Sequence, residues 1–169
     1  MDAGLLIARL IVGLGLAAHG TQKLFGWFGG HGLTGTGGFF ESLGFRPGVL
    51  FALAAGLGEL GGGLLTAAGF LGPVGPALIT VVMLVAILTV HRANGFFASA
   101  NGVEMPLMYL TAALPLAFTG AGAYSVDARL GFDALRGPTV AWIALAAAIV
   151  VALINVALRR PSAPARIAA

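Results

Sequence analysis

The stretch VLFALAAGLGELGGGLLTAAGFL, residues 49–71, decides the fold class of this chain, and Glu59 is its only charged residue. A run of about 20 apolar residues is long enough to cross the hydrocarbon core of a bilayer as an α-helix. At a rise of about 1.5 Å per residue, Glu59 falls about 15 Å from Val49, close to the middle of the membrane. A carboxylate at that depth is costly in lipid, so we expect Glu59 to face the interior of a helical bundle.

Glycines surround Glu59 in the run from Gly56 to Gly63. Small residues allow neighbouring transmembrane helices to approach closely. We therefore expect protein rather than lipid around the carboxylate, and we interpret the rest of the chain as helices arranged around it.

The composition excludes several classes of protein. Of 169 residues, 59% are hydrophobic and only 9% are charged, whereas a soluble domain carries about 25% charged residues. The chain has no cysteine, which excludes thiol–disulfide chemistry, iron–sulfur clusters and thiolate zinc sites. The net charge is +3, but the basic residues are scattered and form no patch for nucleic acid. A polytopic membrane protein is the class that remains.

Five apolar segments of helical length organise the chain. They predict an all-α membrane protein, a polytopic bundle of five membrane-spanning helices. Between the first two lies a glycine-rich loop, residues 26–47, in which residues 39–43 form either a short interfacial helix or an ordered loop. The five segments lie at about residues 3–25, 48–71, 74–90, 105–119 and 139–158.

Lysine and arginine residues predict the orientation, because loops rich in them face the cytoplasm. With five crossings, the 26–47 loop, the 91–104 loop and the C-terminus share one side. That side carries Lys23, Arg46, Arg92, Arg159, Arg160 and Arg166, whereas the other carries Arg129 and Arg136, with Arg9 near the start of the first helix. We therefore expect a plasma-membrane protein with a cytoplasmic C-terminus.

Arg9 is expected to form an ion pair with Glu59. Arg9 lies about 9 Å from the middle of its helix, and Glu59 lies near the middle of the next. A long guanidinium side chain can close most of that gap. Buried pairs also fix the register of helices, so a purely structural role for the pair stays open.

A second polar group is expected where the first and third helices end, because these two helices run in the same direction. His19, Lys23, His91 and Glu104 should gather on that side, one layer above Glu59. Imidazole, ammonium and carboxylate groups at a membrane boundary can bind a polar head group and move protons. The alternatives are that the histidines bond to loop carbonyls and that Glu104 is a charge at a helix N-terminus.

At these residues the chain resembles the DoxX family of small membrane proteins, which are related to the DoxD subunit of thiosulfate:quinone oxidoreductase. The resemblance spans residues 4–124. It rests on the stretches RLIVG from Arg9, HGTQKLFG from His19, GELGG from Gly58, HRANGFF from His91 and NGVE from Asn101. Family members are commonly described as four-helix proteins. We therefore divide the chain into a DoxX-like bundle, residues 1–124, and a loop, an additional transmembrane helix and a short basic tail, residues 125–169.

The resemblance implies a subunit or partner of a membrane-associated oxidoreductase that acts near the quinone pool. We expect a quinone as ligand, no covalently bound cofactor and no metal. The expected partners are the lipid bilayer and a soluble or membrane-bound oxidoreductase, and a homo-oligomer stays open. Ligand contacts are expected from His19, Lys23, His91 and Asn101, and proton transfer from Glu59, His91 and Glu104.

Three other functions remain open at this point. The chain could be a non-catalytic anchor or assembly partner for a soluble oxidoreductase. A midplane acid is also typical of a proton or small-solute transporter, although the chain shows no internal repeat. A haem held by His19 and His91 would need facing imidazole rings, which residue spacing does not determine.

Overall fold

The structure, a computed structural model, describes residues 1–132 and 134–160. This part of the chain is helical and contains no β-strand, which confirms the all-α bundle. The α-helices are α1 (Asp2–Phe25), α2 (Gly32–Ser42), α3 (Gly48–Ala68), α4 (Val74–Ala86), α5 (Glu104–Thr119), α6 (Val126–Leu130) and α7 (Pro138–Ala157). Short helical turns connect them: η1 (Trp27–Gly29), the π-helical turn η2 (Ile87–His91), η3 (Arg92–Asn94) and η4 (Ala98–Ala100).

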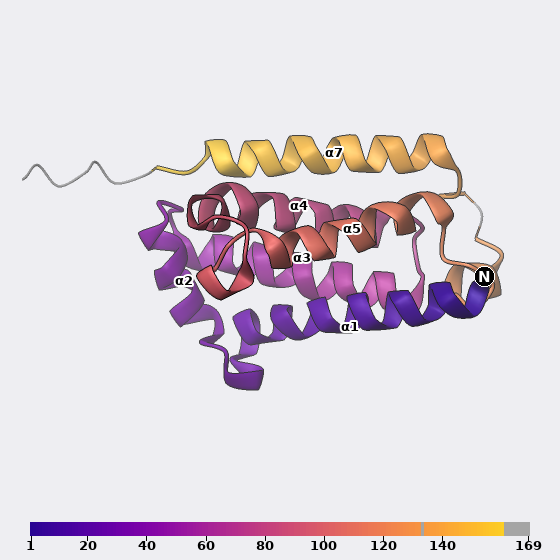
Figure 1. Ribbon diagram of the computed structural model, residues 1–169, viewed down its shortest axis with the longest axis horizontal. Helices are drawn as coiled ribbons and strands as arrows, with labels where there is room; N and C mark the ends of the chain where they lie inside the picture. Colours follow the sequence, from indigo (N-terminus) through magenta and orange to yellow (C-terminus); the bar gives the residue numbers. More distant parts are fainter. Residues whose placement is uncertain (133, 161–169) are drawn as a thin grey trace, which may run out of the picture.

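Five long helices, α1, α3, α4, α5 and α7, run side by side and alternate in direction along the chain (Figure 1). The helix α2 lies across one end of this bundle, which we call the α2 end. The N-terminus, the α3–α4 turn and α6 lie at the other, which we call the α6 end (Figure 1). The connectivity therefore brings the last residues of α1 and α4 and the first residues of α5 together at the α2 end.

Glycines fix how α1 and α3 lie against each other. A Cβ atom built on Gly13 would lie 2.5 Å from the carbonyl oxygen of Gly63, and one built on Gly20 would lie 2.8 Å from that of Gly56. Only glycine permits backbones to approach so closely. This antiparallel register places Arg9 level with the C-terminal end of α3, and it places Glu59 beside the stretch that precedes Gly20.

Within the described residues, four helical segments are long and apolar enough to cross a membrane: residues 2–25, 48–68, 74–94 and 138–157. The last confirms the additional apolar helix expected near the C-terminus. The prediction of five membrane-spanning helices needs one revision, because α5 has only 16 residues. At about 1.5 Å per residue it is about 24 Å long, less than the roughly 30 Å of a hydrocarbon core.

The glycine-rich region 26–47 is more ordered than a loop. The helix α2 extends over 11 residues and packs against α3 and α1, which confirms the helical alternative over a longer range than residues 39–43. The far end of α7 is attached beside it. Arg159 donates from Nε to the carbonyl oxygen of Leu43, and the Arg160 amide donates to that of Gly44 over 2.8 Å. The predicted tail residue Arg166 lies outside the described residues.

Candidate functional site

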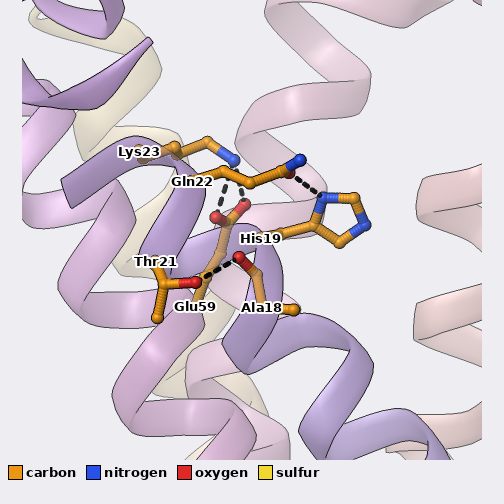
Figure 2. Close-up of polar contacts among 6 residues, drawn as sticks. All are labelled: Ala18, His19, Thr21, Gln22, Lys23 and Glu59. Atoms are coloured by element: carbon orange, nitrogen blue, oxygen red, sulfur yellow. Dashed lines mark hydrogen bonds and ion pairs between the residues drawn. The ribbon is translucent and has the colours of Figure 1, made fainter. Parts of the chain in front are cut away.

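Glu59 is paired with Lys23 (Figure 2). The Lys23 ammonium donates to both carboxylate oxygens, over 2.8 Å to Oε1 and 2.6 Å to Oε2. The Glu59 side chain is 5% exposed and that of Lys23 is 27% exposed. The carboxylate is thus enclosed by the bundle, as expected for an acid in this position, while the ammonium stays accessible. An ammonium has three N–H donors, so this arrangement leaves one of them for a ligand.

The predicted Arg9–Glu59 pair is wrong. Arg9 lies at the α6 end, where its Nη2 donates to the carbonyl oxygen of Tyr124 over 2.6 Å. The charge that faces it is Asp127, whose carboxylate accepts from the Leu71 and Gly72 amides over 3.0 and 2.8 Å. The reason is the helix register. The glycine contacts shift α1 along α3, so Lys23 and not Arg9 reaches the level of Glu59.

A cavity of about 600 Å³ opens beside the Lys23–Glu59 pair. It reaches residues of α1, α2, α3, α4, α5 and α7, and most of its wall is apolar. Its polar and titratable lining residues are His19, Lys23, Glu59, Thr89, His91, Asn101, Tyr109 and Asn155. The structure therefore brings the predicted ligand contacts, His19, Lys23, His91 and Asn101, to the same cavity as Glu59. That they bind a ligand stays a prediction.

Hydrogen bonds determine which nitrogen of each histidine carries a proton. His91 Nδ1 lies 2.8 Å from the carbonyl oxygen of Asn101. A carbonyl oxygen only accepts, so Nδ1 must donate and a neutral His91 accepts through Nε2. His19 Nδ1 lies 3.0 Å from the amide oxygen of Gln22 (Figure 2). The amide nitrogen of Gln22 is engaged with the Phe28 carbonyl, so His19 has the same tautomer. Both imidazoles keep Nε2 for another partner.

Glu104 does not line this cavity. Its carboxylate accepts from the Ala98 amide over 2.7 Å, and its own amide donates to the Phe96 carbonyl over 2.9 Å. These two bonds join the first residue of α5 to the preceding loop. The structure therefore favours the alternative in which Glu104 stabilises a loop and a helix start, and it removes Glu104 from the set around the cavity.

Three lining residues were not predicted from the sequence. Thr89 lies in the π-helical turn η2, an irregularity that is common at functional sites. The Tyr109 ring meets the His19 ring edge to face, with ring centres 6.1 Å apart. Asn155 is the only amide side chain in α7. An amide in an otherwise apolar helix could have indicated Asn155 as a site residue, whereas nothing in the sequence distinguishes Thr89 or Tyr109.

The DoxX family model matches residues 4–92, more than half of the chain. The chain belongs to the DoxX family. This DoxX protein is also 34% identical to the inner membrane protein YqjF of Escherichia coli strain K12 over 132 residues, which cover 76% of the chain and 93% of YqjF. No solved structure gives a significant match. With the apolar helices, these findings identify an integral membrane protein.

The family match covers only part of the cavity wall. It includes His19, Lys23, Glu59 and His91, but it ends before Asn101 and before the helices α5 and α7. Chemically, the polar side of the cavity offers an ammonium donor, two imidazole acceptors and a carboxylate, while the remaining wall is apolar. Such a combination suits an amphiphilic ligand with a polar head group.

Proposed function

We propose that this DoxX protein is a membrane subunit or partner of an oxidoreductase and that it binds a quinone in the cavity beside Glu59. The observation that carries the proposal is the combination found there. The Lys23–Glu59 pair and two histidines with unengaged Nε2 atoms line a cavity whose remaining wall is apolar. A quinone presents two carbonyl oxygens on an apolar body, and this wall offers partners for both parts.

The two redox forms of the ligand would use different atoms of this site. The carbonyl oxygens of a quinone only accept hydrogen bonds, and the third N–H of Lys23 can donate to one of them. The hydroxyl groups of the quinol donate, and the Nε2 atoms of His19 and His91 can accept. Reduction consumes two electrons, which the partner oxidoreductase supplies, and two protons. His91 stands next to the loop that precedes α5 and is suited to carry protons from water to the ligand.

The α2 end is proposed to face the cytoplasm. Five of the described lysine and arginine residues lie near it: Lys23, Arg46, Arg92, Arg159 and Arg160. Arg129 and Arg136 lie toward the α6 end, and the side with more basic residues is retained in the cytoplasm. Protons would then reach His91 from the cytoplasmic side of the inner membrane.

Equilibrium binding of a short-chain quinone and of its quinol to the purified protein in lipid nanodiscs tests the proposal. We expect Lys23→Met to lower the affinity for the quinone by about tenfold or more, because hydrogen bonds to charged groups contribute roughly 1.5–3 kcal/mol. His91→Phe removes a hydrogen-bond acceptor and should lower the affinity for the quinol, by a smaller factor because the imidazole is neutral. Arg92→Gln is the matched control, since Arg92 adjoins His91 but is exposed and lies outside the cavity wall. Equal affinities in all four proteins, or no saturable binding, would contradict the proposal, and the second result would favour the anchor alternative.

A further inference from the structure

The cavity extends well beyond its polar residues. Apolar residues of α2, α3, α4 and α7 line it as well. The small ones are Ala54, Ala55 and Gly58 on α3 and Ala86 on α4. The larger ones include Phe39, Phe40, Leu43, Phe51, Val85 and Val151. We call this apolar part the chain channel.

The packing of α3 and α4 explains why the channel lies at the α2 end. Near their connecting turn the two helices touch closely. A Cβ atom on Gly75 would lie 2.8 Å from the Thr66 amide nitrogen, and one on Gly62 would lie 2.9 Å from the Leu78 Cβ atom. Toward the α2 end, Ala54 and Ala55 of α3 and Ala86 of α4 line the cavity together with larger side chains of α4 such as Val82 and Val85. The close contact and the channel therefore lie at opposite ends of the α3–α4 pair.

The helix α7 forms the outer wall of the channel. It packs mainly on α4 and only lightly on α5. Arg159 and Arg160 attach its last turn to the residues that follow α2. Val151 and Asn155, one turn apart, face the cavity from α7. Of these two side chains, the Asn155 amide stands nearer the α2 end and Val151 lies deeper in the bundle.

We infer that the chain channel holds the apolar prenyl chain of the quinone whose head group lies beside Lys23 and Glu59. This inference rests on the proposed function, and it adds the ligand class: a long-chain membrane quinone and not a soluble, chainless one. The polar residues and the channel line one continuous cavity, so a single amphiphile can occupy both. Most of the channel lies within the family match, and the added helix α7 contributes one further part of its wall through Val151.

Two neighbouring valines of α7 provide the test. Val151 lines the channel and is 50% exposed, whereas Val150 is 54% exposed and lies outside the wall. We expect Val151→Trp to narrow the channel and Val150→Trp to leave it open. Binding of a long-chain quinone and of its chainless head group is measured for both variants and the natural protein, in nanodiscs of one lipid composition. Thermal unfolding of each variant is recorded alongside.

The expected result is specific to the chain. Val151→Trp should lower the affinity for the long-chain quinone by about tenfold, the loss expected when about two methylene groups stay unburied. It should leave the affinity for the chainless head group unchanged. Val150→Trp should change neither affinity. Equal effects of the two variants, or equal loss of the long-chain and chainless ligands, would overturn the inference while the proposed function stands. Absence of head-group binding in the natural protein would reject the proposed function and this inference with it.

Discussion

The helix α1 carries a basic side chain toward each end, and the two have different surroundings. Arg9 is 2% exposed and is enclosed by the Tyr124 carbonyl and by Asp127. Lys23 is 27% exposed in its side chain, pairs with Glu59 and lines a cavity. Both ends therefore contain a cation facing a carboxylate, and a cavity opens at each. The cavity at the α6 end, of about 480 Å³, is lined by Asp127 but not by Arg9, so of the two cations only Lys23 lines a cavity. A charge inside a membrane helix marks a candidate site by default, and a cavity beside the charged group shows which of the two a ligand can contact.

The largest expected effect on stability comes from disturbing the α1–α3 register, which positions both Arg9 and Lys23. Gly63→Val would put a Cβ atom 2.5 Å from the carbonyl oxygen of Gly13, a backbone atom that cannot move aside cheaply. We expect the free energy of unfolding to fall by more than about 3 kcal/mol, at the upper end for overpacked interiors. Thermal unfolding in detergent measures it. Gly61→Val is the matched control, because a Cβ atom there meets nothing within 4 Å. Equal losses in the two variants would contradict the role given to the close glycine contacts between α1 and α3.

The next largest effect is expected at the α6 end. Asp127→Ala would leave the Leu71 and Gly72 amides without their acceptor and Arg9 without its facing charge. Leaving a buried donor without its acceptor costs about 1–3 kcal/mol. We expect a loss of unfolding free energy of this order, with quinone affinity unchanged in the folded fraction. A loss of affinity as large as that of Lys23→Met would show that the two ends are not separate.

A smaller effect distinguishes the observed ion pair from the one expected from the sequence. Double-mutant cycles with Lys23→Met and Glu59→Gln should give a coupling energy of about 1–2 kcal/mol, reduced by the partial exposure of Lys23. The corresponding cycle with Arg9→Met and Glu59→Gln should be additive within about 0.5 kcal/mol, because distant residues without shared partners rarely couple. A stronger coupling of Glu59 to Arg9 than to Lys23 would contradict the observed pair and support the pair expected from the sequence.

The smallest effect is expected for Glu104. Glu104→Gln keeps an oxygen that can accept from the Ala98 amide and removes only the charge. We expect unfolding to change by less than about 1 kcal/mol and quinone affinity to stay the same. A loss of affinity as large as that caused by His91→Phe would show that Glu104 contributes to ligand binding. The binding assay described above measures this directly.

The sequence predicted the fold and the side of the bundle on which the site lies. Apolar runs separated by glycine and proline define the helices, and alternating directions place His19 and His91 at one end. This inference needs only the order of the helices and not their contacts. The enclosure of Glu59 followed for the same reason, since the cost of a carboxylate in lipid does not depend on which residue faces it.

The partner of Glu59 could not be predicted, because it depends on how far α1 is shifted along α3. The chain has 27 glycines, and many pairs could have provided the close contact that Gly13 and Gly63 make. Arg9 and Lys23 are 14 residues apart on α1, about four turns, so this shift decides which of them reaches the level of Glu59. The chain channel could not be predicted from the sequence for a related reason. It depends on how the small residues of α3 lie against the larger side chains of α4 and on the position of α7, and the order of residues along the chain shows neither.

Photolabelling with a light-activated quinone analogue, followed by peptide mapping, tests the central claim most directly because it reports which end of the bundle holds the ligand. We predict label within residues 16–23, 54–59 and 85–91, which line the cavity beside the Lys23–Glu59 pair, and we predict that excess unlabelled quinone removes it. Label confined to residues 117–137 at the α6 end, or label that unlabelled quinone does not displace, would contradict the account.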